Sequence, residues 1–203
     1  MTARQQPQRP KPPSSRAGEE IVEAVLAAAE TVIDEDGLDR FTTSRVVERA
    51  GVSVGSLYQY FPSKESILAE LARRLERRTQ HRIIEILAGS TGDLLEHTAG
   101  QIIDVLLVGI GGLEFRRALR RAVPQGWIED TASEVDLAVR AQLAGELARR
   151  SDVRTGEHAL MAWVIGHAIE GAIEAAVLVD PELARSAPFR AELVELVTRY
   201  LRK

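Results

Sequence analysis

The sequence has 203 residues and a formal net charge of −4, and 45% of its residues are hydrophobic, which suits one large soluble domain or two small ones. It contains no cysteine, which excludes a disulfide framework, a thiolate metal site and a cysteine nucleophile. No apolar run reaches the roughly 20 uncharged residues of a membrane span, and the N-terminus lacks the apolar core of a secretory signal, so we expect a cytoplasmic protein.

Residues 1–17 carry four basic residues and no acidic one, together with Pro7, Pro10, Pro12 and Pro13. Such a segment cannot bury an apolar face, so we predict a disordered basic arm. A basic arm that precedes a DNA-binding domain can enter the minor groove, whereas composition alone favours a solvated tail.

Two further segments predict helices and a tight turn. The apolar repeat Ile21, Val25, Ala28 and Val32 predicts a first helix over residues 18–35. The stretch from Thr42 to Lys64 then holds two short helical patterns. Thr42 or Thr43 can cap the first, Gly51 can form a left-handed turn, and Ser53 can cap the second, which extends through Tyr60. Helix, glycine turn and helix is the helix-turn-helix arrangement, although ordinary helical hairpins share its spacing.

The second of these helices has the chemistry of a DNA-reading helix. Leu57 and Phe61 lie on one face and anchor it to a core. The remaining side chains are short or amphipathic, so the backbone can approach bases and phosphates. Lys64 adds a positive charge beside the start of the next helix, a common phosphate-binding arrangement.

The run AGVSVGSLYQYFPSKESIL, residues 50–68, resembles the DNA-binding signature of the TetR family of transcriptional regulators. The resemblance extends from about Ile21 to Leu71 and departs at Val47, where the family often carries alanine. It implies an all-α homodimer, with a three-helix helix-turn-helix domain over residues 18–65 and a ligand-binding and dimerisation domain over residues 66–203.

The resemblance also implies roles for individual residues. It places Thr43, Tyr60 and Lys64 at DNA phosphates. It places five residues at or near the bases, namely Ser44, Ser53, Gly55, Ser56 and Tyr58.

A fourth helix is predicted from Ser63 past Leu75, and its far half is charged nearly all round. From residue 88 the chain reads as helices separated by glycine or proline. The predicted breaks lie near residues 89–92, 109–112, 123–126, 151–156 and 180–188.

Two C-terminal helices are candidates for a dimer interface. The segment 158–178 is apolar almost all round and needs cover on two sides, and the last helix carries one apolar stripe. The pair resembles the helices that form the family's four-helix dimer interface, whereas the alternative is that both are monomer core. The predicted interface residues are Trp163, Ile169, Ile173, Phe189, Leu193, Leu196, Val197 and Tyr200.

An effector pocket is predicted mainly from the family resemblance. Apolar walls with a few polar groups are typical of small-molecule sites. The candidate lining combines one polar stripe with large aromatic residues, namely His97, Gln101, Asp104, Phe115, Trp127 and Trp163. For each of these residues, core packing or a solvated edge is the alternative.

The sequence holds no nucleophile elbow, zinc-protease pair or phosphate loop, so we expect neither enzymatic activity nor a cofactor. His167, Glu170 and Glu174 share a helical face and have suitable donors for zinc or manganese, but polar residues at an interface show the same pattern.

We therefore predict a ligand-responsive regulator, a repressor that binds a palindromic operator as a homodimer and that a small, largely apolar effector releases. One alternative is a DNA-binding structural or interaction protein without an effector. Another is a metal-binding protein or enzyme that uses His167, Glu170 and Glu174.

Overall fold

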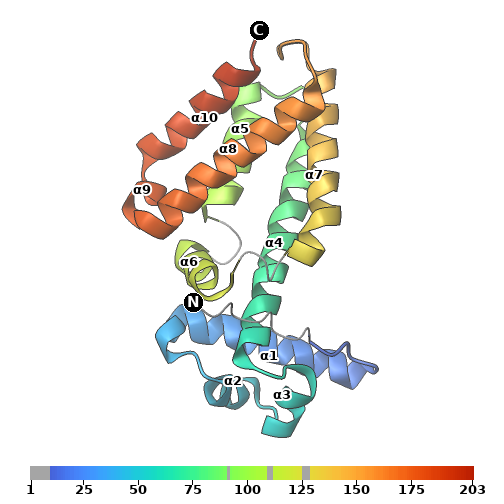
Figure 1. Cartoon of the computed structure of the whole chain (residues 1–203), viewed down its shortest axis with the longest axis vertical. Coiled ribbons are helices and arrows are strands. Elements are labelled where there is room, and N and C mark those ends of the chain that lie inside the picture. Colours follow the sequence, from blue (N-terminus) through green and yellow to red (C-terminus); the bar gives the residue numbers. More distant parts are fainter. Residues whose placement is uncertain (1–9, 91, 109–111, 125–128) are drawn as a thin grey trace, which may run out of the picture. The chain divides into compact units, whose positions relative to one another are not determined.

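The computed structural model describes residues 10–90, 92–108, 112–124 and 129–203, and their regular elements are helices (Figure 1). The all-α prediction is thus confirmed. The elements are α1 (Arg16–Asp36), the 3-10 helix η1 (Leu38–Arg40), α2 (Thr43–Ala50), α3 (Val54–Tyr60), α4 (Lys64–Gly89), α5 (Leu95–Val108), α6 (Gly112–Ala122), α7 (Glu129–Arg149), α8 (His158–Val179), α9 (Pro181–Arg185) and α10 (Ala187–Leu201).

The chain forms two compact units. Unit 1 comprises residues 1–74 and 114–130, and unit 2 comprises residues 75–113 and 131–203. The boundary between them falls within α4, after Arg74, rather than at its start. The functional division into residues 18–65 and 66–203 stays a prediction.

Unit 1 is built on α1, which packs against α2 and α3 (Figure 1). The helix begins two residues before its predicted start because the Ser15 side chain caps it, accepting the Gly18 N–H at 3.2 Å. Gly37 ends it with a φ of 76°. Val25, Val46 and Phe61 are fully buried, so residues from several elements share one small core.

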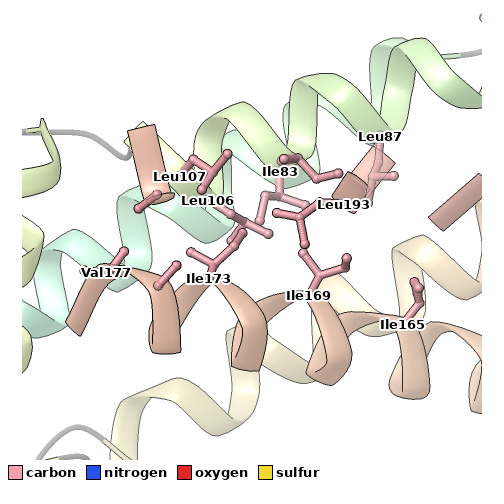
Figure 2. Close-up of a cluster of buried hydrophobic side chains, with 12 residues drawn as sticks. Ile83, Leu87, Leu106, Leu107, Ile165, Ile169, Ile173, Val177 and Leu193 are labelled. Carbon is pink, nitrogen blue, oxygen red and sulfur yellow. The ribbon is translucent and has the colours of Figure 1, made fainter. Parts of the chain in front are cut away.

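Unit 2 has a core cluster in which side chains from α4, α5, α8 and α10 meet. Figure 2 shows this cluster, with Ile83 and Leu87 from α4 facing the isoleucines of α8. Its labelled members are Ile83, Leu87, Leu106, Leu107, Ile165, Ile169, Ile173, Val177 and Leu193.

The most apolar described helix is α8, with a mean hydropathy of 1.5 over its best window, and by length and composition it could span a membrane. Its buried residues recur at the spacing of one helical face and belong to the unit 2 core. Burial in the core therefore explains the apolar character of one face of α8, whereas only 33% of that window is buried in the single chain.

Candidate nucleic-acid interface and interior cavity

The turn between α2 and α3 has the local geometry that the sequence predicted. Thr42 caps α2 by accepting the Arg45 N–H at 3.3 Å. Gly51 is left-handed, with a φ of 65°. Ser53 caps α3 by accepting the Ser56 N–H at 3.0 Å. These bonds satisfy otherwise unpaired N–H groups and fix where each helix begins.

One face of α3 is buried and the other is open. Leu57 is fully buried, whereas Val54 is 56% exposed and Tyr58 is 48% exposed. Gly55 and Gln59 are also exposed, on the side opposite Leu57. Val54 and Gln59 were not among the predicted base-contacting residues. Gln59 lies two residues from Leu57, on the opposite side of the helix, so its position could have indicated it. Val54 precedes Leu57 by three residues, so helical spacing alone could not have indicated its exposure.

Polar side chains from both helices meet at this open face. The Thr43 and Tyr58 hydroxyls lie 3.3 Å apart, which links the start of α2 to α3. The Ser53 and Ser56 hydroxyls are 2.8 Å apart. Ser44 is exposed in the first turn of α2. Most of the predicted DNA-contacting residues thus belong to one continuous helix-turn-helix surface.

Tyr60 is the exception, because it is buried. Its hydroxyl faces the first turn of α1, where a methyl group on Gly18 would come within 2.5 Å of it. Tyr60 follows Leu57 by three residues and therefore shares its inward face. The implied phosphate contact by Tyr60 does not fit this placement.

The helix-turn-helix surface has fewer unpaired positive charges than its basic residues in the sequence suggest. Arg45 pairs with Asp36 and Arg49 pairs with Glu35, so both arginines tie α2 to the end of α1. Lys64 is exposed, and in the described part of the chain it has no ion pair. The Lys11 N–H donates to the Tyr60 carbonyl at 3.0 Å, which places the end of the arm beside the last residue of α3.

Unit 2 contains a cavity of about 100 Å³ among α4, α5, α7, α8 and α10. The walls are mostly aliphatic, and four side chains with polar groups interrupt them, namely Thr98, Glu146, Arg150 and Glu170. The aliphatic lining includes Ile83, Leu87, Leu95, Ile102, Ile103, Leu106, Val139, Leu143, Leu147, Ile165, Ile169, Val197 and Leu201.

The predicted polar stripe of α5 does not line this cavity. His97, Gln101 and Asp104 are exposed. Asp104 accepts two hydrogen bonds from Arg190 of α10, at 2.5 and 2.7 Å. The adjacent face of α5, which carries Thr98 and Ile102, lines the cavity instead. The repeat of buried residues along α5 was the signal that could have found it.

The predicted aromatic lining is also placed elsewhere. Phe115 is buried in unit 1, and Trp163 is an exposed residue of α8 that stacks on His167 with ring centroids 4.1 Å apart. Trp127 lies outside the described residues.

Charged groups at the cavity have different surroundings. Glu146 is buried and accepts a hydrogen bond from Arg149 at 2.7 Å. Arg150 donates twice to Asp152, at 2.9 Å each, and once to the Asp93 carbonyl. Partial desolvation of the carboxyl raises the pKa of Glu170 above its ordinary value of 4.5, although the residue is exposed, and nearby Glu76 and Asp136 raise it further.

The proposed metal-ligand set is not assembled. Across the residues that the structure describes, no three histidine or carboxylate groups are arranged to hold a metal ion. His167 Nδ1 lies 2.8 Å from the Trp163 carbonyl, and its Nε2 lies 3.3 Å from Arg140. Both ring nitrogens are therefore engaged within the protein.

The predicted dimer residues fall into two groups. Ile169, Ile173 and Leu193 are buried in the unit 2 core of a single chain, so their assignment to an interface was wrong. Trp163 is 49% exposed and Leu196 is 46% exposed. Phe189, Val197 and Tyr200 are partly buried against the core. The outer face of α8 further exposes Leu160 and Val179, which the prediction had omitted.

Comparison with known proteins agrees with this architecture. Residues 25–71 match bacterial regulatory proteins of the tetR family, and residues 95–201 match the tetracyclin repressor-like C-terminal domain. Among solved structures, a TetR-family regulator from Mesorhizobium loti superposes with a TM-score of 0.63 at 21% identity, covering 94% of this chain and 95% of that one. NemR from E. coli gives a TM-score of 0.62 at 20% identity, covering 90% and 98%.

Curated relatives match only the N-terminal part. A nucleoid occlusion factor, SlmA, from Actinobacillus pleuropneumoniae is 35% identical over 68 residues, which cover 34% of this chain and 32% of that protein. The HTH-type transcriptional regulator YvdT of Bacillus subtilis is 39% identical over 61 residues, or 30% and 31% of the two chains. The match thus spans about a third of the length of these relatives. Because the C-terminal family match alone covers more than half of the chain, this protein belongs to the TetR family of DNA-binding transcriptional regulators.

Proposed function

We propose that this protein is a cytoplasmic, homodimeric repressor that binds a palindromic operator through α3 and leaves it when a small, largely apolar effector binds unit 2. The observation that carries the DNA-binding part is the open face of α3, opposite the buried Leu57. A helix with one anchored face and one open face can lie in a major groove without exposing its core.

The exposed side chains suggest how the operator is read. Val54 can contact a thymine methyl group, and Gln59 can form two hydrogen bonds with adenine. Tyr58, Gly55 and the capping serines complete the surface nearest the bases. Thr43 and Lys64 then hold phosphates, and Ser44 lies beside them. In this arrangement the contacts to bases determine which sequence is bound, and the contacts to phosphates determine how the protein is positioned on the DNA.

Dimerisation is supported by the exposed apolar face of α8 and α10. Leu160, Trp163, Val179 and Leu196 are all more than 40% exposed in the single chain. Tryptophan is among the residues most enriched at interface centres. A two-fold interface there would present two copies of α3 to two half-sites.

The effector is supported by the unit 2 cavity, because an aliphatic enclosure with few polar groups is typical of a small-molecule site. The alternative is a DNA-binding structural protein without an effector. The similarity to nucleoid occlusion factors is consistent with this alternative, but that similarity covers only 34% of this chain. An operator complex that no cavity ligand dissociates would favour the alternative.

Lys64→Ala tests the DNA-binding surface. Removing one phosphate contact should weaken binding to operator and random DNA alike, and should make the salt dependence of the binding constant shallower by about one unit. Val54→Ala and Gln59→Ala should instead change the preferred sequence. Binding constants would be measured by fluorescence anisotropy at several salt concentrations.

The matched control is Lys203→Ala, which removes an exposed charge at the far end of the sequence and should leave both constants unchanged. If all three α3 and α4 variants lost specific and random binding equally, α3 would not be the reading helix.

A further inference from the structure

The basic arm that precedes α1 is attached to the end of α3. The Lys11 N–H donates to the Tyr60 carbonyl at 3.0 Å. Tyr60 is the last residue of α3, where carbonyl groups have no partner within the helix, so this bond satisfies one of them. Both groups belong to the main chain, so the attachment does not engage the Lys11 side chain.

A second contact fixes the path of the arm between Lys11 and α1. Gly18 is buried in the first turn of α1, and a methyl group there would come within 2.5 Å of the Tyr60 hydroxyl and 3.1 Å of Pro13 Cβ. The absence of a side chain at Gly18 therefore lets Tyr60 and Pro13 approach the helix. Pro12 and Pro13 further restrict the backbone of this stretch. The described part of the arm thus has a defined position at the C-terminal end of α3.

That end of α3 is close to a DNA strand when the helix lies in a major groove. The helix has seven residues and is therefore roughly 10 Å long, and the groove is about 12 Å wide. A helix of this length that lies in the groove has its ends near the phosphate backbones that border it. The minor groove begins beyond each backbone. A chain that leaves from Tyr60 therefore meets phosphates first and the minor groove next.

The charge and length of the arm suit this position. Up to Lys11 it carries Arg4, Arg9 and Lys11 and no acidic residue. Lys11 is exposed and, like Lys64 at the start of α4, has no ion pair within the described residues. Ten residues precede Lys11, and when extended they can span about 33 Å, which is enough to cross one backbone and enter a minor groove about 6 Å wide.

We propose that the basic arm is a second DNA-binding element, in which Lys11 contacts a phosphate near the end of α3 while Arg4 and Arg9 enter the adjoining minor groove. Arginine is attracted to narrow, A·T-rich minor grooves because their negative potential is enhanced. The inference rests on the proposed function, since it takes α3 as the helix in the major groove. It adds a second groove to the surface that selects the operator.

The first test measures how much charge the arm contributes to binding. The full chain would be titrated by fluorescence anisotropy, at 50 to 200 mM salt, with a random duplex and with an operator duplex that the wild-type protein selects from a random library. The double variant Arg4→Gln, Arg9→Gln should make the salt slope shallower by about two units, so the affinity lost over this range should be about tenfold smaller. Lys11→Ala should change the slope by about one unit, and the matched control Lys203→Ala should leave it unchanged.

The second test asks whether the minor groove is read. The base pairs adjoining each selected half-site would be made A·T, G·C or I·C. Inosine lacks the 2-amino group of guanine, so I·C has the minor-groove pattern of A·T and resembles G·C in the major groove. Wild type should bind the A·T and I·C duplexes alike and at least about fivefold more tightly than the G·C duplex. The double arginine variant should lose this preference.

A third comparison isolates the attachment to α3. Lys11→Ala and Lys11→Pro remove the same charge, but only proline removes the N–H that donates to Tyr60. The flank preference should therefore be weaker in Lys11→Pro than in Lys11→Ala. Equal preference in these two variants would contradict the anchoring role of Lys11.

The proposal would be overturned if the double arginine variant kept the wild-type salt slope, if wild type bound all three flanks equally, or if I·C behaved as G·C. Failure of the proposed function gives a different result, in which wild type binds every duplex in the library alike. The salt slopes on random DNA would then still decide whether the arm contacts DNA.

Discussion

Gly55 lies inside α3, where glycine is unfavourable relative to alanine because it has more backbone freedom to lose on folding. No contact among the described residues requires it. A methyl group there would meet only the Ser53 hydroxyl, at an ordinary contact distance of 3.8 Å, and φ is not positive. Close approach of a DNA groove, as in the proposed function, would supply a reason for this glycine.

Gly55→Ala should raise stability and weaken operator binding together. Alanine in a helix interior adds about 0.5–1 kcal/mol to the free energy of unfolding, while the new methyl group would separate α3 from the bases. Chemical denaturation and anisotropy titration would measure the two effects. Gly145→Ala, inside α7, is the control that should stabilise without affecting DNA. Unchanged operator affinity in Gly55→Ala would remove Gly55 from the interface.

Glu170 gives a prediction for the dependence of stability on pH. Its pKa is raised in the folded chain by partial desolvation and then by Glu76 and Asp136, whereas His167 and Arg140 act in the opposite direction. Protonation thus favours the folded state, so this contribution is fully present below about pH 4.5 and is lost as pH rises through the raised pKa.

Glu170→Gln should therefore raise the melting temperature at pH 7 by no more than about 2 °C, with the gain disappearing toward pH 4. Differential scanning calorimetry across this pH range would measure it. Glu192→Gln, on the exposed side of α10, serves as the control. A lower melting temperature for Glu170→Gln at pH 7 would show that the charged carboxylate stabilises the fold.

At the scale of elements, α8 has two apolar faces with different roles. The face that carries Ile165, Ile169 and Ile173 is buried within unit 2 (Figure 2). The outer face carries Trp163 and small residues such as Gly171, where an added methyl group would meet no atom of the described residues within 4 Å. An open stripe of this kind permits close approach of a second helix.

Leu196→Glu should separate the proposed dimer without unfolding the chain. The side chain is exposed in the monomer, so the charge costs little there, but an interface would bury it without a partner. We expect the dimer dissociation constant to rise by at least about 30-fold, equivalent to roughly 2 kcal/mol. Analytical ultracentrifugation and thermal melting would be measured together.

Leu137→Glu is the matched control, because Leu137 is another exposed leucine, on α7. Ile169→Glu should instead unfold the chain, since Ile169 belongs to the core. A Leu196→Glu protein that sediments as wild type would place the interface elsewhere.

At the scale of the whole molecule, α4 is one of the segments in which the chain passes from one unit to the other. It contributes Lys64–Arg74 to unit 1 and Leu75–Gly89 to unit 2. Its last residue in unit 1, Arg74, donates two hydrogen bonds of 2.6 Å to Glu23 of α1. In unit 2, Ile83 and Leu87 border the cavity. Any ligand that displaces these two side chains acts on the same helix that follows the DNA-reading surface.

A cavity ligand and the operator should therefore weaken each other's binding by the same factor. Allosteric coupling of about 1–3 kcal/mol corresponds to a change of roughly 5- to 150-fold, and thermodynamic linkage requires it to be reciprocal. Anisotropy titrations of labelled operator with a small aliphatic probe, and calorimetric titrations of the probe with and without operator, would measure both directions. Ligand binding that leaves the operator constant unchanged would show that the cavity has no regulatory role.

The sequence by itself determined the local structure of the DNA-binding segment. Caps at Thr42 and Ser53, a left-handed Gly51 and an inward Leu57 follow from short-range hydrogen bonds and helical spacing, so neighbouring residues suffice to predict them. The family signature in the same stretch added the expectation of DNA binding.

Only the tertiary structure decided which faces of the helices meet. An apolar residue of α8 looks the same in sequence whether it packs in its own core or faces outward, so Ile169 and Trp163 could not be separated. Likewise, a rotation of about 100° between neighbouring helical positions decides that Thr98 lines the cavity while His97 is exposed. Pairing of Arg45 and Arg49 with acids at the end of α1 also depends on contacts between helices. Such choices depend on packing between segments far apart in the chain, which local pattern does not encode.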